Sequence, residues 1–326
     1  MSSVGSVRFQ CPKSKSSELP GHRLAYVRIN LPFNITTSFD RAPHQLDTMR
    51  VLFGLTVALL LLSAGCLENG QDTSQSEPSE HVFSSGFEPT VSIIDVNENF
   101  ADIIGSDGLP LISYQDSSNL DLRVAHCQTI DCTTSSKSTV EVTGGVGAYS
   151  SIAVGSDGLG VISYYDATKS ELKVAHCNSV FCTTSDVSTV DSSGDVGQYT
   201  SITIGSDGFA LVSYYDVTNS ALKIAHCTNL VCSQSTVETI DADGTVGKQT
   251  SIAIGIDGYG LVSYFDATND DLKVAHCSSI DCSTFTVSSA VTLGGTGDWN
   301  SLAIGSDGRG VISHYDSFNG SLEVAH

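Results

Sequence analysis

The sequence predicts an all-β fold, a β-propeller of four-stranded blades, and two observations carry this prediction. Segments of one pattern, ADIIGSDG, SIAVGSDG, SITIGSDG, SIAIGIDG and SLAIGSDG, begin at residues 101, 151, 201, 251 and 301, so the period is 50 residues. Each unit holds four short runs rich in β-branched and aromatic residues and no long helical period. Four strands in a repeat of this length are typical of a propeller blade. A β-solenoid, whose coils are usually shorter, and a string of separate small domains are the alternatives.

The unit that starts at residue 151 shows the expected order of strands. Strands are predicted at 151–155, 161–165, 172–177 and 184–191. Asp157-Gly158 supplies the first tight turn, because glycine tolerates a positive φ. The second turn begins at Asp166 and leads into the third strand.

The number of blades follows from the two ends of the repeat region. Residues 90–95, TVSIID, resemble residues 236–241, TVETID, which are a predicted fourth strand. The region therefore starts with a lone fourth strand, holds four complete units and ends three strands into a fifth. We expect residues 90–95 to complete the last blade and close a five-bladed ring, which hides open sheet edges. The alternative is a truncated larger propeller, because the chain stops at His326, one residue before the cysteine that the repeat predicts.

The segment before the repeats predicts export. Met49-Arg50 precedes the apolar run VLFGLTVALLLL, and Ser63-Ala64-Gly65 precedes Cys66, the pattern of a secretory signal. The run is too short to span a membrane. A cysteine after Ala-Gly resembles the prokaryotic lipoprotein signal, which implies a lipid on Cys66, and hence a membrane-anchored protein on the cell surface or in the periplasm.

The chain is thereby divided into four parts. These are 1–48, an irregular extension that translation from Met49 would omit; 49–65, the signal peptide; 66–87, a flexible tether; and 88–326, the propeller repeats. A genuine cytoplasmic extension is the alternative for residues 1–48.

Charge restricts the partners. The formal net charge is −21, and residues 1–50 hold seven of the fifteen basic residues, which leaves 8 basic against 33 acidic residues downstream. Such acidity argues against a nucleic-acid partner. The expected partners are a membrane, through the lipid at Cys66, and a glycan or a surface protein.

Eight of the ten cysteines form a repeated pattern. The pairs are Cys127 with Cys132, Cys177 with Cys182, Cys227 with Cys232 and Cys277 with Cys282. Each pair brackets the turn between the third and fourth strands, so that the two residues are expected opposite each other, within reach of a disulfide in an oxidising compartment. Zinc is the rival, because a histidine precedes each first cysteine, but cysteine-rich zinc sites suit reducing compartments better.

One face of the propeller is the candidate ligand site. The aspartates that begin the second-to-third turns are Asp116, Asp166, Asp216, Asp266 and Asp316. They form either Asx turns or a ring of ligand-binding carboxylates. The links between units open on the same face and carry Tyr149, Tyr199 and Trp299 at matching positions, where the third unit has Gln249. Carboxylates beside aromatic rings suit a sugar or a cation such as calcium.

Two further sets of repeated residues have simpler explanations. The aspartates Asp107, Asp157, Asp207, Asp257 and Asp307 precede glycine in the first-to-second turns and are expected to form those turns. The histidines His126, His176, His226, His276 and His326 end the third strands near the opposite face. We expect partly buried, hydrogen-bonded histidines there; a metal or a pH-sensing role is the alternative. No cofactor motif is present.

The run SIAVGSDGLGVISYYDATKSELKVAHC resembles the repeats of secreted bacterial and archaeal propellers of the sialidase-like, BNR-type superfamily. The resemblance covers residues 88–326 and implies a propeller at the cell surface, but little about activity. The Asp-box of true sialidases reads Ser-x-Asp-x-Gly-x-Thr-Trp, and Gly155-Ser156-Asp157-Gly158 lacks that spacing and the tryptophan. Sialidases use three arginines for the substrate carboxylate, whereas only Arg123 and Arg309 follow the signal.

Near-identical repeats supply symmetric carboxylates, whereas a glycosidase needs two carboxyls in distinct roles. The asymmetric residues are few: Pro110, Trp299, Arg309 and His314. The sequence therefore favours a lipid-anchored binding or scaffold module over an enzyme. The alternatives are a glycoside-active enzyme of the same fold and a purely structural surface protein.

Overall fold

The computed structural model describes residues 100–292 and 294–326, and these form nineteen strands in five antiparallel sheets. The strands of the first three sheets are β1 (Phe100–Ile104), β2 (Pro110–Asp116), β3 (Asp121–Cys127), β4 (Ser135–Glu141), β5 (Val146–Val154), β6 (Gly160–Asp166), β7 (Glu171–Cys177), β8 (Ser185–Asp191), β9 (Val196–Ile204), β10 (Ala210–Asp216), β11 (Ala221–Cys227) and β12 (Ser235–Asp241). The last two sheets hold β13 (Val246–Ile254), β14 (Gly260–Asp266), β15 (Asp271–Cys277), β16 (Phe285–Val291), β17 (Thr296–Ile304), β18 (Gly310–Asp316) and β19 (Ser321–Ala325). No helix that is long and apolar enough to cross a membrane occurs among these residues.

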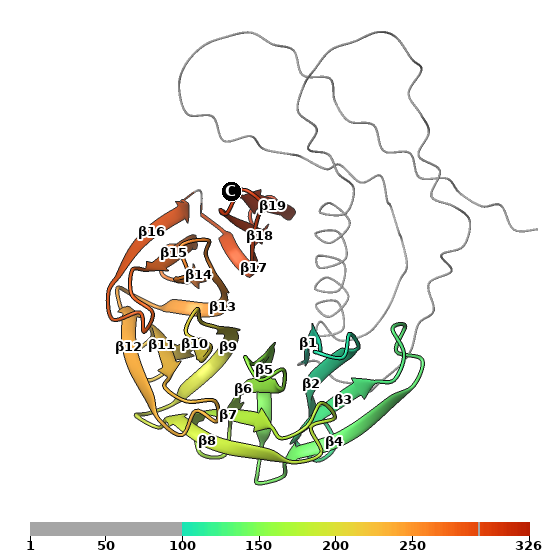
Figure 1. Cartoon of the computed structure of the whole chain (residues 1–326). Coiled ribbons are helices and arrows are strands. Elements are labelled where there is room, and N and C mark those ends of the chain that lie inside the picture. Colours follow the sequence, from blue (N-terminus) through green and yellow to red (C-terminus); the bar gives the residue numbers. More distant parts are fainter. Residues whose placement is uncertain (1–99, 293) are drawn as a thin grey trace, which may run out of the picture.

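The five sheets follow an arc around a common centre, with the first strand of each sheet innermost and, in the four sheets that have one, the fourth strand outermost (Figure 1). The predicted β-propeller is therefore confirmed, and we number the sheets blade 1 (β1–β4) to blade 5 (β17–β19). Blades 1 and 5 stand at the two ends of the arc. The predicted closing strand at residues 90–95, the signal peptide, the tether and the lipid site at Cys66 all lie outside the described residues.

The predicted strands agree with the observed ones except at the start of each blade. The first strand of blade 2 begins at Val146 rather than at residue 151, because Val146 is buried and its N–H donates to the carbonyl of Leu120 in blade 1. A β-bulge follows, at which the pairing with β6 shifts register between Ala148 and Ser151. The bulge turns residue 149 out of the sheet, and the same shift recurs in blades 3, 4 and 5.

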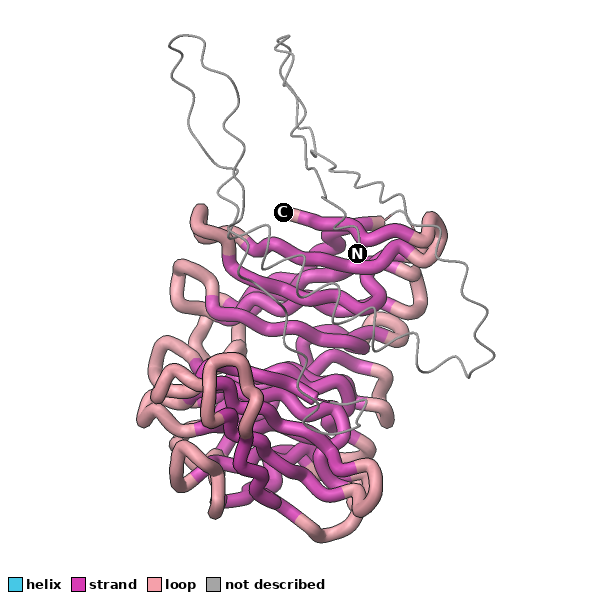
Figure 2. Tube along the Cα trace, turned by 90° about the vertical axis from the view of Figure 1, so that its right-hand side faces the viewer, coloured by secondary structure: helices cyan, strands magenta, loops and turns pink. Residues whose placement is uncertain are grey.

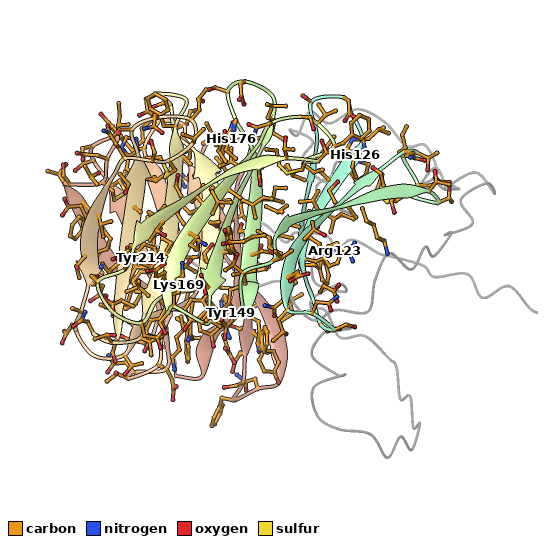
Figure 3. All side chains as sticks on the ribbon, turned by 90° about the horizontal axis from the view of Figure 1, so that it is seen from below. Arg123, His126, Tyr149, Lys169, His176 and Tyr214 are labelled. Carbon is orange, nitrogen blue, oxygen red and sulfur yellow. A yellow bond between two sulfur atoms is a disulfide. The ribbon has the colours of Figure 1, made fainter. Side chains whose placement is uncertain are left out.

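The strands run between two rims of turns and loops (Figure 2). We call one rim the link face; it carries the second-to-third turns, such as 117–120, and the links between blades, such as 142–145. The other rim is the disulfide face, with the first-to-second turns and the third-to-fourth loops. Figure 3 shows His126 and His176 near one rim and Tyr149 and Lys169 near the other.

The four disulfides confirm the predicted pairing of the cysteines. The bonds join Cys127 to Cys132, Cys177 to Cys182, Cys227 to Cys232 and Cys277 to Cys282, with Cα atoms 4.7–4.8 Å apart. The first cysteine of each pair ends the third strand of its blade. Each disulfide thus ties the loop of the disulfide face to the end of that strand.

The position of the second cysteine in each pair is a correction to the sequence analysis. The two cysteines were expected opposite each other on neighbouring strands, but Cys127 is opposite Ser135 in the sheet. The second cysteines instead lie inside the loop, before the fourth strand begins: Cys132, Cys182, Cys232 and Cys282. The reason is a tight turn within the loop. Each of these four residues has a φ of 49–55°, and its N–H donates to the carbonyl three residues earlier, as Cys182 does to Ser179 at 2.9 Å.

Polar contacts also fix the disulfide face. In every blade the histidine near the end of the third strand contacts the aspartate of the first turn, as in His176 Nε2 to Asp157 Oδ2 at 2.9 Å. The histidines thus have the expected hydrogen-bonding partners. The turn aspartate serves two purposes, because Asp157 Oδ1 also accepts the N–H of Leu159 within its own turn.

Buried charges join one blade to the next. At the junction of blades 2 and 3, Asp191 Oδ2 accepts hydrogen bonds from Tyr214 Oη and Lys223 Nζ, both at 2.6 Å. Burial acts to raise the pKa of Asp191, but the bonds from Lys223 and Tyr214 outweigh it and hold this pKa below its usual value. The same network is formed by Glu141, Tyr164 and Lys173 between blades 1 and 2, and by Asp241, Tyr264 and Lys273 between blades 3 and 4.

We expect Lys223→Met to lower the free energy of unfolding by about 3 kcal/mol, because it leaves the Asp191 carboxylate buried without its cation. Chemical denaturation checks this. Lys169→Met is the control, because it removes an exposed lysine from the second-to-third turn of blade 2. It should change stability by less than about 0.5 kcal/mol. Equal effects of the two substitutions would contradict a buried ion pair at the junction.

Candidate functional site

The five aspartates of the second-to-third turns form Asx turns. Each carboxylate lies under its own turn and accepts backbone N–H groups two or three residues ahead, as Asp216 Oδ1 does from Asn219 at 2.9 Å. Asp116, Asp166, Asp216, Asp266 and Asp316 are at most 7% exposed. The turn-forming role is thus occupied in every blade, and these carboxylates do not line an open ring.

The aromatic residues of the links lie on the link face, on the bulges of the innermost strands. Tyr149, Tyr199, Gln249 and Trp299 all have a φ of 52–55°, an unusual conformation for side chains of this size. The rings of Tyr149 and Tyr199 are 4.7 Å apart between centroids, so the two blades present one continuous aromatic surface. Trp299 is 50% exposed, and its backbone N–H donates to the side-chain oxygen of Gln249.

Polar groups accompany these rings. Tyr165 Oη donates to Asp195 Oδ1 at 2.7 Å, and the Lys248 ammonium lies 5.7 Å from the centre of the Tyr215 ring. Burial, followed by the neighbouring Tyr199, raises the pKa of Tyr149 to about 12, so its hydroxyl is neutral at physiological pH. The surface therefore offers rings, hydroxyls, a carboxylate and a cation together.

At three junctions a threonine closes the link between blades. Thr168, Thr218 and Thr268 each accept the backbone N–H of the link, at 2.7–2.8 Å. The preceding link glycine is needed for this close approach. A Cβ on Gly144, for example, would lie 2.4 Å from Thr168 Oγ1.

Between blades 4 and 5 this closure is absent. Phe318 stands in place of the threonine and is 86% exposed. The link there includes Gly294-Gly295, both with φ near 70°, and a Cβ at Gly294 would meet no atom within 4 Å. The result is an open hollow of ≈ 470 Å³ lined by Asp270, Gly294, Gly295, Ser317 and Phe318.

One acidic residue lines this hollow on the blade 4 side. Asp270 lines it, and Asp271 is the next residue, at the start of β15. Burial, then the charges of Asp266 and Asp270, raise the pKa of Asp271. Among residues 100–292 and 294–326, no group of three or more His, Cys, Asp or Glu side chains is placed to hold a metal ion.

Sequence reasoning identified Tyr149, Tyr199 and Trp299 as residues of this face but missed Asp270, Asp271 and Phe318. A signal for Phe318 was present, because the turns DATKS, DVTNS and DATND have threonine where DSFNG has phenylalanine. Of the asymmetric residues, Trp299 lies on the link face, and His314 is buried within β18. Arg309 follows the first turn of blade 5, on the disulfide face.

Solved structures of similar fold include an α-L-arabinofuranosidase from Lactobacillus brevis, with 11% identity over 69% of this chain and 89% of that chain, at a TM-score of 0.43. They also include a GH43 β-1,3-galactosidase, with 10% identity over 69% of this chain and 55% of that one, at 0.46. An exo-β-1,3-galactanase from Clostridium thermocellum has 11% identity over 73% of this chain and 60% of that one, at 0.47. The chain thus spans a little over half the length of the last two. No family model and no curated protein matches.

These neighbours correct one expectation. The sequence was interpreted first as a lipid-anchored binding or scaffold module and second as a glycoside-active enzyme, whereas the solved structures of similar fold are glycosidases. The near-identical repeats drew attention away from the junction between blades 4 and 5, which differs from the other three described junctions. At such low identity the likeness itself establishes only the fold.

The threonine closure predicts a difference between equivalent positions. Thr218→Ala should lower the free energy of unfolding by about 1 kcal/mol, because the N–H of Asp195 loses its acceptor. Phe318→Ala, at the same repeat position, should change stability by less than about 0.5 kcal/mol, since its ring is exposed. Thermal or urea unfolding measures both, and similar losses would show that the hollow is closed like the other junctions.

Proposed function

We propose that this protein is a glycoside-active enzyme and that its site is the hollow between blades 4 and 5 on the link face. One observation carries the proposal: the repeat is broken at this junction so that the exposed ring of Phe318 and the carboxyl group of Asp270 line one opening, with Asp271 next in the chain. Sugars present apolar ring faces that stack on aromatic side chains, and hydroxyls that bond to carboxylates. Trp299, on the innermost strand of the same blade, is a second exposed aromatic residue of this face.

We assign each step of glycoside hydrolysis to a residue at or next to the hollow. Hydrolysis of a glycosidic bond needs a carboxylic acid that protonates the leaving oxygen and a carboxylate that assists on the other side. We assign the proton donor to Asp271, because its raised pKa keeps the proton bound to a higher pH. Asp270, which lines the hollow, is assigned the carboxylate role, and Phe318 the stacking surface.

Export with a lipid on Cys66 is proposed together with this activity, as is kinship with the secreted sialidase-like propellers. Four disulfides suit an oxidising compartment. An exported enzyme would meet glycans outside the cytoplasm. Incorporation of labelled palmitate into the full chain, and its loss in Cys66→Ser, tests the anchor separately from the activity.

Turnover tests the proposed function. The full chain, produced in a host that exports it and forms disulfides, is assayed on a panel of p-nitrophenyl glycosides and of neutral polysaccharides for released reducing ends. We expect hydrolysis of at least one substrate, and a loss of kcat of about 100-fold or more in Asp270→Asn and in Asp271→Asn. Phe318→Ala should mainly raise KM.

The matched control is Asp121→Asn. Asp121 begins the third strand of blade 1, as Asp271 does in blade 4, but lies away from the hollow. It should retain full activity. An absence of turnover across the panel, or turnover that survives both Asp270→Asn and Asp271→Asn, would remove this proposal.

A further inference from the structure

Blade 5 departs from the buried network that joins the other blades. At each of the three junctions from blade 1 to blade 4, the network consists of an acid at the end of the preceding fourth strand, a tyrosine and a lysine. Between blades 4 and 5 the three positions are Val291, His314 and Glu323. The lysine has thus become a carboxyl group, and the acid of the preceding blade has become an apolar side chain.

The substituted residues share one face of the blade 5 sheet. His314 and Glu323 are direct partners across β18 and β19, and Asp316 lies two residues after His314 on β18. Glu323 occupies the repeat position of the lysine, which places its carboxyl group beside that of Asp316. In blades 2, 3 and 4 a lysine ammonium instead lies 3.6–3.9 Å from the corresponding aspartate.

Asp316 also holds the turn that carries Phe318. Its Oδ1 accepts the N–H groups of Phe318 and Asn319 at 2.8 and 2.9 Å, and its Oδ2 accepts Asn319 Nδ2 at 2.6 Å. The charge on this carboxylate therefore acts on the wall of the hollow. Whatever stabilises Asp316 in its turn also positions Phe318.

Within the part of the chain that the structure describes, no cation neutralises the carboxyl pair. Burial lowers the pKa of His314, so the imidazole stays neutral close to physiological pH, and its Nδ1 is buried without a hydrogen-bond partner. On the blade 4 side the facing position is the uncharged Val291. The charged groups of the adjacent blade 4 turn are Asp266, Asp270, Asp271 and Lys273, and Lys273 is bonded to Asp241 of blade 3. Two adjacent carboxyls without a cation strongly favour a single shared proton.

We propose that Glu323 is a positioning residue for the hollow: it shares a proton with Asp316, and this proton holds the turn that places Phe318. Loss of the proton leaves two adjacent negative charges, which loosens the turn. This inference rests on the proposed function only for what Phe318 contacts; the proton-dependent turn itself stands on the contacts within blade 5.

The direction of the pH dependence follows from the two carboxyl groups. Burial and the charge of Asp316 raise the pKa of Glu323. For Asp316, burial acts to raise the pKa, but the N–H groups and side chain of Asn319 and the N–H of Phe318 lower it overall. The proton therefore resides on Glu323. Its contribution to stability is complete below the ordinary pKa of glutamate and is lost as the pH rises through the raised value.

Trp299 provides the readout, because it is the single tryptophan of the whole chain and lies on β17 of the same blade. Its fluorescence is recorded in the full chain from pH 4 to 8 without any ligand. We expect a step whose midpoint lies above the ordinary glutamate pKa. Glu323→Gln, which mimics the protonated state, and Glu323→Lys, which restores the repeat's ammonium, should both abolish the step.

Glu171→Gln is the matched control, because Glu171 lies opposite the equivalent turn aspartate in blade 2. It should leave the step in place. Circular dichroism at each pH verifies that every variant is folded. A wild-type chain without a step, or a step that persists in Glu323→Gln, would overturn the inference. Since no substrate is used, an inactive protein with the step would reject only the proposed function, and an active one without it only the present inference.

Discussion

The structure depends on buried carboxylates that each serve two partners across a blade junction. Asp191 lies at the end of blade 2, yet it accepts the hydroxyl of Tyr214 and the ammonium of Lys223 from blade 3. A buried ion pair adds little net stability but is costly to break, so it fixes which surfaces meet and in what register. Three junctions repeat this arrangement, which gives the arc its regularity.

Regularity explains where function can arise. A site made of identical turns supplies identical carboxylates, and their Asx turns already use them, as at Asp216. Asymmetric chemistry therefore requires a junction at which some of the repeated side chains have changed. Between blades 4 and 5 the network residues, the threonine closure and the aromatic side chain of the bulge have all changed. The hollow at Phe318 and the acidic side chains beside it occur at that junction.

The turn aspartates show how one residue can serve both the fold and the site. In blades 2 to 4 each carboxylate is balanced by a lysine and only shapes its turn. In blade 5 the position of the lysine is occupied by Glu323, whose pKa responds to the charge of Asp316. Asp316 still accepts the N–H of Phe318. A single exchange of charge thus links protonation to the shape of a surface hollow.

The sequence by itself determined the strands, the turns, the disulfide pairs and the propeller, because the constant 50-residue period repeats each local pattern four or five times. It also indicated Tyr149, Tyr199 and Trp299 at matching positions on one face. Only the tertiary structure decided that the turn aspartates are buried under their own turns, that the first strands start earlier at a bulge, and that the second cysteine of each disulfide lies inside its loop. It alone brought Asp270 next to Phe318, since these residues are 48 positions apart and meet only because adjacent blades pack side by side. Contacts between blades depend on packing geometry, which the pattern within one repeat does not encode.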